Sequence, residues 1–212
     1  MPSPLHEALL QLFRNRPELA PDLLRGALRA DVPDYLEVRI DSAELNEVQP
    51  AEYRPDMIAL LLRDEPVMGI VVEVQLSTDE RKQFAWPAYV TNLRARLRCP
   101  VYLLVFAADE SVAHWARRPI DLSGGCLFTP WVLSRRNVPE ITDDVLAQAD
   151  PELAVLSAYS HGHDANIHKT ARIALAACNA SRALDEDRAK LCALVHCATP
   201  FAHDSSLPPL QN

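Results

Sequence analysis

The sequence predicts an α/β domain built on a mixed sheet with flanking helices, and three observations lead to this prediction. Two apolar runs, 54–62 and 67–76, flank a short polar break, which is typical of a β-hairpin. A third apolar run, 101–106, follows the hairpin after a stretch with helical character. A strand reached through a helical crossover lies parallel to the strand before it. Antiparallel and parallel pairing are therefore expected in one sheet.

The N-terminal part predicts two helices and a strand before the hairpin. Residues 4–15 carry apolar side chains at helical spacing and predict the first helix. We expect a second helix over 20–28 and a strand over 35–40. After the hairpin, Ser77 and Glu80 have the spacing of a capping box, which predicts that the crossover helix begins at Ser77.

The crossover and the strands after it follow from proline positions and apolar runs. Pro87 lies inside the expected helix and predicts a kink or a restart there. Residues 101–106 have no polar face, which indicates a buried strand in the interior of the sheet. Residues 126–133 are typical of a weaker edge strand, interrupted by Pro130.

The chain is expected to comprise a core, an extension and a tail. Residues 1–136 form the α/β core, residues 137–198 a helical C-terminal extension packed on it, and residues 199–212 a flexible tail. The apolar stripes of the extension need a partner surface, either this domain or a second subunit, so a homodimer stays open. Its expected helices are 151–159, 167–180 and 184–198, and the apolar stripe of the second contains Ile173, Leu175 and Ala176.

Composition favours a cytoplasmic protein without membrane contact. With 212 residues, of which 49% are hydrophobic, the chain is large and apolar enough for one globular domain. No apolar run reaches the roughly 18 residues of a membrane span. Residues 2–16 are amphipathic and charged, unlike a signal peptide. The five scattered cysteines in apolar surroundings are typical of buried thiols in a reducing compartment.

The net charge of −8 is unevenly distributed along the chain. Residues 31–80 hold 3 basic and 13 acidic side chains, whereas residues 81–136 hold 9 basic and 3 acidic ones. An acidic block beside a basic block would suit metal ligands next to a phosphate-binding surface. Ordinary solvated faces of mixed sign are nevertheless the more common reason for such counts.

Two carboxylates, Asp56 and Glu73, are predicted to face each other across the hairpin. If the turn centres between Asp64 and Glu65, the two acids are equally far from it and lie opposite each other. Directly opposed side chains are about 5 Å apart on one face of the sheet, and like charges there repel. The pair therefore needs a cation, and a metal site is the leading interpretation.

Glu73 and Gln75 are expected on the same face of their strand, near its carboxyl end. Open α/β sheets bind their ligands at that end. Burying Glu73 without a partner would be costly, so a purely structural interpretation must also supply one. An ion pair between Arg54 and Asp56 is the structural alternative.

At these residues the chain resembles the PD-(D/E)XK, or restriction-endonuclease-like, nuclease superfamily, and most nearly its group of recombination-promoting nucleases and putative transposases. Pro55-Asp56 is similar to the "PD" of that motif, and Glu73-Val74-Gln75 to its "(D/E)XK" with glutamine in place of lysine. His6-Glu7 is similar to the His-Asp opening of this group. The resemblance covers roughly residues 5–106, with a further likeness of Glu-Val-Gln-Leu and Trp-Pro-x-Tyr to bacterial proteins of no known activity.

The resemblance implies a restriction-endonuclease-like core that hydrolyses phosphodiester bonds with Mg²⁺ or Mn²⁺. DNA is the expected substrate, and RNA stays open as the alternative. Asp56 and Glu73 would be metal ligands, and the main-chain carbonyl of Val74 a third. Gln75 would hydrogen-bond the attacking water but carries no charge. Lys82 could take the place of the missing lysine, although a solvent-facing helical lysine is an equal alternative.

Glu7 is the weakest of the metal ligands that the resemblance implies. It falls nearly opposite the apolar stripe of its helix, so exposure is favoured over a role in the site.

Trp86, Tyr89 and Trp115 could stack on bases, but core packing is favoured. The histidines between 161 and 168 lack a zinc spacing and are expected in a surface loop.

Two competing functions stay open. A catalytically decayed nuclease fold could act as an interaction or regulatory module, which the charge of −8 and the uncharged Gln75 favour. A structural α/β domain would instead hold Asp56 in the ion pair with Arg54. A metal ion between Asp56 and Glu73 would distinguish the nuclease from both.

Overall fold

The computed structural model describes residues 4–41, 54–107, 109–162 and 166–181. Internal contacts group the chain into two compact units. The sheet unit is Arg16–Val138, and the helical unit combines the chain up to Asn15 with the chain from Pro139 onward. The first helix therefore groups with the C-terminal helices, although the sequence placed it in the core. The expected helix 184–198 and tail 199–212 lie outside the described residues.

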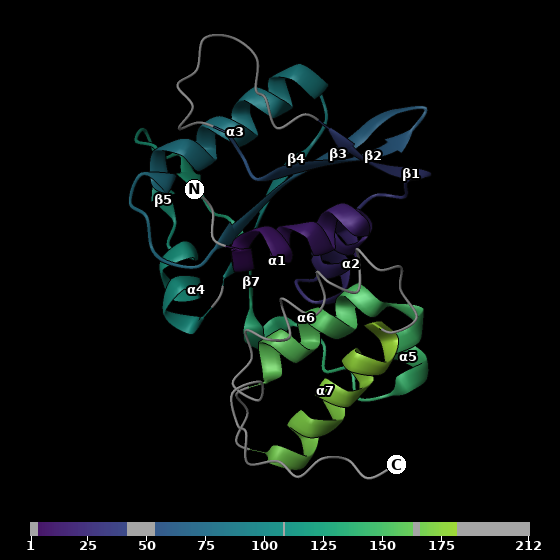
Figure 1. Ribbon diagram of the computed structural model, residues 1–212. Helices are drawn as coiled ribbons and strands as arrows, with labels where there is room; N and C mark the ends of the chain where they lie inside the picture. Colours follow the sequence, from purple (N-terminus) through teal and green to yellow (C-terminus); the bar gives the residue numbers. More distant parts are fainter. Residues whose placement is uncertain (1–3, 42–53, 108, 163–165, 182–212) are drawn as a thin grey trace. The chain divides into compact units, whose positions relative to one another are not determined.

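The sheet unit contains a five-stranded mixed sheet in the order β1-β2-β3-β4-β7 (Figure 1). The first three strands pair antiparallel, and β4 and β7 continue the sheet in parallel. As predicted, β4 is parallel to β3 and lies in the interior of the sheet. The strands are β1 (Glu37–Asp41), β2 (Met57–Arg63), β3 (Glu65–Gln75), β4 (Val101–Ala107) and β7 (Trp131–Ser134).

The hairpin register agrees with the prediction near the two acids but not near the turn. Met57 pairs with Val72, as expected for a turn centred between Asp64 and Glu65. At the turn, however, Arg63 pairs with Glu65, and Asp64 alone spans the reversal with φ of 60°. A bulge in the hairpin then shifts the register by one residue. The tighter turn shifts the register by one residue and the bulge shifts it back, so Asp56 and Glu73 lie opposite each other as predicted.

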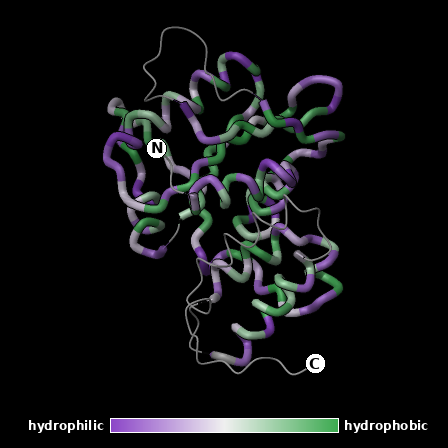
Figure 2. Tube along the Cα trace, viewed as in Figure 1, coloured by the Kyte–Doolittle hydropathy of each residue, from purple (hydrophilic) through white to green (hydrophobic). Residues whose placement is uncertain are grey.

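Two helices cover one face of this sheet, α3 (Lys82–Leu97) and α4 (Glu110–Ala116). Figure 1 shows α3 running along that face, and Figure 2 shows the strands largely in the hydrophobic colour. The far end of α3 lies so close to β3 that a Cβ on Gly69 would meet Leu97 and Val101 at 3.2 Å, which explains a glycine inside a strand. On the described chain, α2 (Leu19–Gly26) also contacts β3.

The helix α3 begins at Lys82, so the capping box at Ser77 is wrong. The cause is Asp79, whose carboxylate accepts the N–H of Arg81 at 3.1 Å and pairs with the Arg81 guanidinium. This local turn replaces the helical start that the sequence predicted. Pro87 lies inside α3, which continues through it without a restart.

The weak strand expected over 126–133 is divided at Pro130. Its first part becomes β6 (Leu127–Phe128), which pairs with β5 (Ile120–Asp121) in a separate small sheet. Its second part becomes β7, which forms the edge of the main sheet beside β4, as expected of an edge strand.

The helical unit packs α6 (Pro151–His161) against α1 (Pro4–Asn15), α5 (Asp144–Ala149) and α7 (Ile167–Ser181). The predicted stripe on α7 is only partly correct, because Leu175 is 54% exposed. His161 is buried in the last turn of α6, so its assignment to a surface loop is wrong. None of the helices in the described part of the chain has both the length and the apolar character of a membrane span.

Candidate functional site

Asp56 and Glu73 meet at one end of the hairpin through two main-chain hydrogen bonds. The N–H of Asp56 donates to Oε1 of Glu73 at 3.3 Å. In return, the N–H of Val74 donates to Oδ2 of Asp56 at 2.8 Å. Asp56 directly precedes β2, and Glu73 lies within β3. Each carboxylate is thus fixed by the backbone of the opposite strand.

The carboxylate of Glu73 is completely buried, at 0% exposure, and its second oxygen accepts three further donors. Nε2 of Gln75 and Nε1 of Trp86 each lie 3.2 Å from Oε2. The ammonium group of Lys82 pairs with the same oxygen. Burial and the nearby Asp56 raise the pKa of Glu73, and Lys82 and Trp86 oppose this shift by favouring the charged form.

The helix α3 supplies two of the donors to Glu73, because its first turn lies over the carboxyl end of β3. Lys82 is the first residue of α3, Trp86 follows one turn later, and Tyr89 extends the same stripe. Nζ of Lys82 lies 6.0 Å from the centre of the Tyr89 ring. The Lys82 side chain retains 20% exposure, so the site reaches solvent at this residue.

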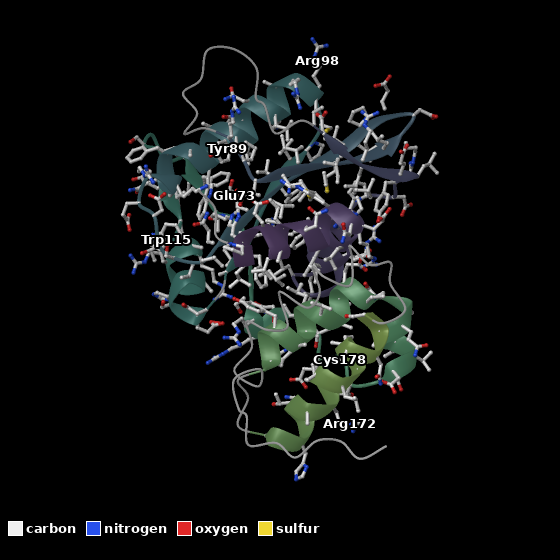
Figure 3. All side chains as sticks on the ribbon, in the orientation of Figure 1. Glu73, Tyr89, Arg98, Trp115, Arg172 and Cys178 are labelled. Carbon is white, nitrogen blue, oxygen red and sulfur yellow. The ribbon has the colours of Figure 1, made fainter. Side chains whose placement is uncertain are left out.

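An aromatic pair extends the site toward α4. The rings of Trp86 and Trp115 are tilted by 55° with their centres 5.3 Å apart. Nε1 of Trp115 donates to Oε1 of Glu80 at 3.1 Å. Figure 3 labels Glu73 and Trp115 among the side chains of this unit. Trp86 and Tyr89 are buried, which confirms core packing for both, whereas Trp115 is only partly buried.

The sequence analysis did not predict Trp86 as a partner of Glu73, and for Lys82 it left a site role and a solvent-facing position equally open. In the structure, both side chains donate to the Glu73 carboxylate. The available signal was the spacing of four residues between them, which puts both side chains on one face of a helix. The error in the start of α3 obscured this signal.

The carboxylate pair is the main candidate for holding a cation. In the described parts of the chain, no three residues of the types His, Cys, Asp and Glu gather as metal ligands would. Here the positive charge beside Glu73 comes from Lys82. Glu7 lies on α1 in the helical unit, exposed and 3.5 Å from Arg14. Its exposure agrees with its position opposite the apolar stripe.

Much of the basic block 81–136 is neutralised within the protein. At least five of its nine basic residues pair with carboxylates of the described chain: Arg81, Lys82, Arg96, Arg117 and Arg136. Arg94 and Arg98 are exposed and, among the described residues, have no carboxylate partner. They line a hollow of about 530 Å³ at the end of α3, and Figure 3 shows Arg98 at this end.

Comparison with known proteins adds no relative: no family model matches the chain, and neither a curated protein nor a solved structure matches it. The class of protein that its fold defines is therefore an α/β protein with a five-stranded mixed sheet flanked by helices. The cluster around Glu73 is its main group of buried polar side chains in the described sheet unit.

Proposed function

We propose that this chain is a metal-dependent nuclease of the PD-(D/E)XK type, with a restriction-endonuclease-like sheet unit, that hydrolyses phosphodiester bonds in DNA. The observation that supports it most is that Asp56 and Glu73 are joined by two hydrogen bonds to main-chain N–H groups. In addition, Gln75 and Lys82 both donate to the Glu73 carboxylate. These groups lie where β3 and β4 end together, since Gln75 pairs with Ala107. That end of a parallel sheet is the usual position for a ligand.

The donor chemistry of the pair fits Mg²⁺ or Mn²⁺ in part. Both ions prefer oxygen ligands, which the carboxylates of Asp56 and Glu73 and the main-chain carbonyl of Val74 would supply. Oε2 of Glu73, however, already accepts three N–H donors. An ion would therefore meet Glu73 at Oε1, which accepts the N–H of Asp56 at 3.3 Å and retains a lone pair. A bound ion would lower the pKa of a water and offset charge on the phosphate.

Lys82 is the residue that would replace the lysine of the motif. Gln75 occupies the motif position but carries no charge, whereas Lys82 brings an ammonium group to the same carboxylate oxygen from α3. A positive charge at this place would stabilise the charge that develops on a phosphate during hydrolysis. Gln75 would orient Glu73 and, through its amide, a water.

A second candidate is a decayed nuclease fold that acts as an interaction or regulatory module. Two observations favour it. The Glu73 carboxylate is already satisfied by four donors within the protein. At least five of the nine basic residues expected to meet phosphates pair internally instead. In this alternative the cluster stabilises the fold and has no catalytic role.

Nicking of supercoiled plasmid in the presence of Mg²⁺ or Mn²⁺ tests the proposal. We expect the wild type to nick, a chelator to stop it, and Asp56→Asn or Glu73→Gln to lower the rate by about 100-fold or more. Glu80→Gln is the matched control, because Glu80 lies between β3 and α3 and its carboxylate accepts the N–H of Trp115 at the surface. A wild type that does not nick, or a Glu73→Gln variant as active as Glu80→Gln, would exclude the nuclease and favour the module.

A further inference from the structure

The outer edge of β1 (Glu37–Asp41) is open in the described part of the sheet unit. The strand pairs with β2 on its inner side, and no described strand pairs with its other side (Figure 1). An open edge presents a row of main-chain N–H and C=O groups that can pair with another strand. The side chains of β1 therefore determine which strand can add there.

The side chains exposed along this edge are two charged groups and two apolar groups. Glu37 and Arg39 are exposed on one face of the sheet, and neither has an ion-pair partner among the described residues. Both lie opposite leucines of β2, which cannot neutralise them. On the other face, Ile40 is 40% exposed, and Leu36, which directly precedes β1, is 77% exposed. The described chain thus leaves both the charges and the apolar surface of this edge without a complement.

Antiparallel pairing between two copies of β1 is possible in only a few registers. Opposed residues must both direct their main-chain groups toward the partner strand or both away from it, so a two-fold axis has to pass through a residue. An axis through Glu37 would set the two copies of Glu37 against each other, and an axis through Arg39 would do the same for Arg39. Like charges in directly opposed positions are destabilising. The charges of the edge therefore disfavour both of these registers.

An axis through Val38 instead gives each exposed group of this edge a complement. Glu37 of each copy then lies opposite Arg39 of the other copy, which makes two opposite-charge pairs. Leu36 of each copy lies opposite Ile40 of the other, so that the exposed apolar groups cover one another. The strand is thus complementary to itself in this register and repelled in the two neighbouring ones.

We propose that β1 is the interface of a homodimer, in which two copies of the strand pair antiparallel about a two-fold axis through Val38 and join their sheets into one. This inference goes beyond the proposed function and does not depend on it. The axis is perpendicular to the sheet, so the α3 helices of both copies cover the same face of the joined sheet. Arg96 of α3 pairs with Asp41 of β1 at 2.6 Å, so the far end of α3 reaches this edge. The dimer therefore places Arg94 and Arg98 of both copies on one face.

Sedimentation equilibrium of the full chain over a series of protein concentrations tests the inference. A single pair of five-residue strands is a small interface, so the wild type should approach twice its monomer mass of 23.6 kDa only at micromolar concentrations or above. Glu37→Lys and Arg39→Glu each turn the two opposite-charge pairs into two like-charge pairs. Each variant alone should therefore dimerise at least about tenfold more weakly than the wild type.

An equal mixture of the two variants separates pairing across the axis from any effect within one copy. In a heterodimer of Glu37→Lys with Arg39→Glu, both opposed pairs again carry opposite charges. We expect the mixture to regain the dimer mass, with a dissociation constant within about threefold of the wild type, because the pairs have the same strength. Asp144→Lys is the matched control, since it makes the same change of charge at the exposed first residue of α5 and should leave the mass unchanged.

Three results would overturn the dimer through β1. A wild type that stays monomeric throughout the series shows that two copies do not pair, and leaves the edge to a strand of a different protein. A dimer that persists in both variants, or a mixture that stays monomeric, shows that Glu37 and Arg39 do not face each other across an axis. A dimer that is lost in Asp144→Lys but kept in Glu37→Lys has its interface at α5 in place of β1.

Discussion

The ammonium group of Lys82 pairs with the buried carboxylate of Glu73, so that the first residue of α3 is joined to the interior of β3. This pair connects an exposed helical turn to a carboxylate at 0% exposure. It supplies the positive charge that two neighbouring acids require.

The coupling between Lys82 and Glu73 should be large for an ion pair. Because Glu73 is buried and Lys82 mostly so, removing one partner leaves an uncompensated group in the core. A double-mutant cycle with Lys82→Met and Glu73→Gln, measured by urea unfolding, should give a coupling free energy of about 1–3 kcal/mol. The exposed pair Arg96 and Asp41 is the matched control and should give less than about 1 kcal/mol. Equal coupling in the two pairs would contradict the structural role of Lys82.

The indole N–H of Trp86 should contribute measurably to stability. In Trp86→Phe the ring still packs, but Oε2 of Glu73 loses a donor in a buried position. We expect a decrease of about 1–3 kcal/mol in the free energy of unfolding. Trp115→Phe is the control, because its N–H donates to the exposed Glu80 and should cost about 1 kcal/mol or less. A reversed order of the two losses would show that the bond to Glu73 is unimportant.

Asp109 should make the stability of the sheet unit depend on acid pH. Its carboxylate caps α4, and the hydrogen bonds from Val112 and Ser111 hold the pKa of Asp109 below its ordinary value of 3.8. The folded state therefore favours the charged form, and this stabilisation is present above pH 3.8 and is lost as the pH falls through the lower folded pKa. Asp109→Ala should cost about 1 kcal/mol at pH 7. Unfolding curves for wild type and variant should converge in acid, and a difference that grows there would refute the assignment.

Arg94 and Arg98 should contribute to nucleic-acid affinity if the chain binds a phosphate backbone. Both are exposed at the end of α3 and line the same hollow. Changing both to glutamine should weaken DNA binding and reduce the slope of log affinity against log salt by about 0.9 per arginine. Arg96→Gln is the control, since Arg96 already pairs with Asp41 at 2.6 Å. Fluorescence anisotropy over a salt series measures the slopes, and identical slopes for all variants would exclude this surface.

The sheet and the parallel or antiparallel direction of its strand pairs could be predicted, because apolar runs and connection lengths determine them. The parallel pairing of β3 and β4 followed from the helical crossover alone. The turn was predicted to centre between Asp64 and Glu65 but centres on Asp64, because this single residue reverses the chain in the left-handed conformation. The bulge that compensates for it has no sequence signal, so the correct facing of Asp56 and Glu73 depended partly on two errors that cancel.

The partners of Glu73 were harder to predict than the carboxylate itself. The start of α3 depended on whether Ser77 or Asp79 organises the turn, and both are good helix-capping types. The short helices α4 and α5 gave no apolar periodicity long enough to be recognised. At Leu175 the error has the opposite sign: the residue lies on an expected apolar stripe, but its side chain is exposed.

The metal site between Asp56 and Glu73 is the central claim, and anomalous X-ray diffraction from crystals grown with Mn²⁺ and a short phosphorothioate DNA duplex tests it most directly. We expect an anomalous peak in contact with both carboxylates. Crystals with duplex bound but no anomalous peak at these carboxylates would contradict the metal site.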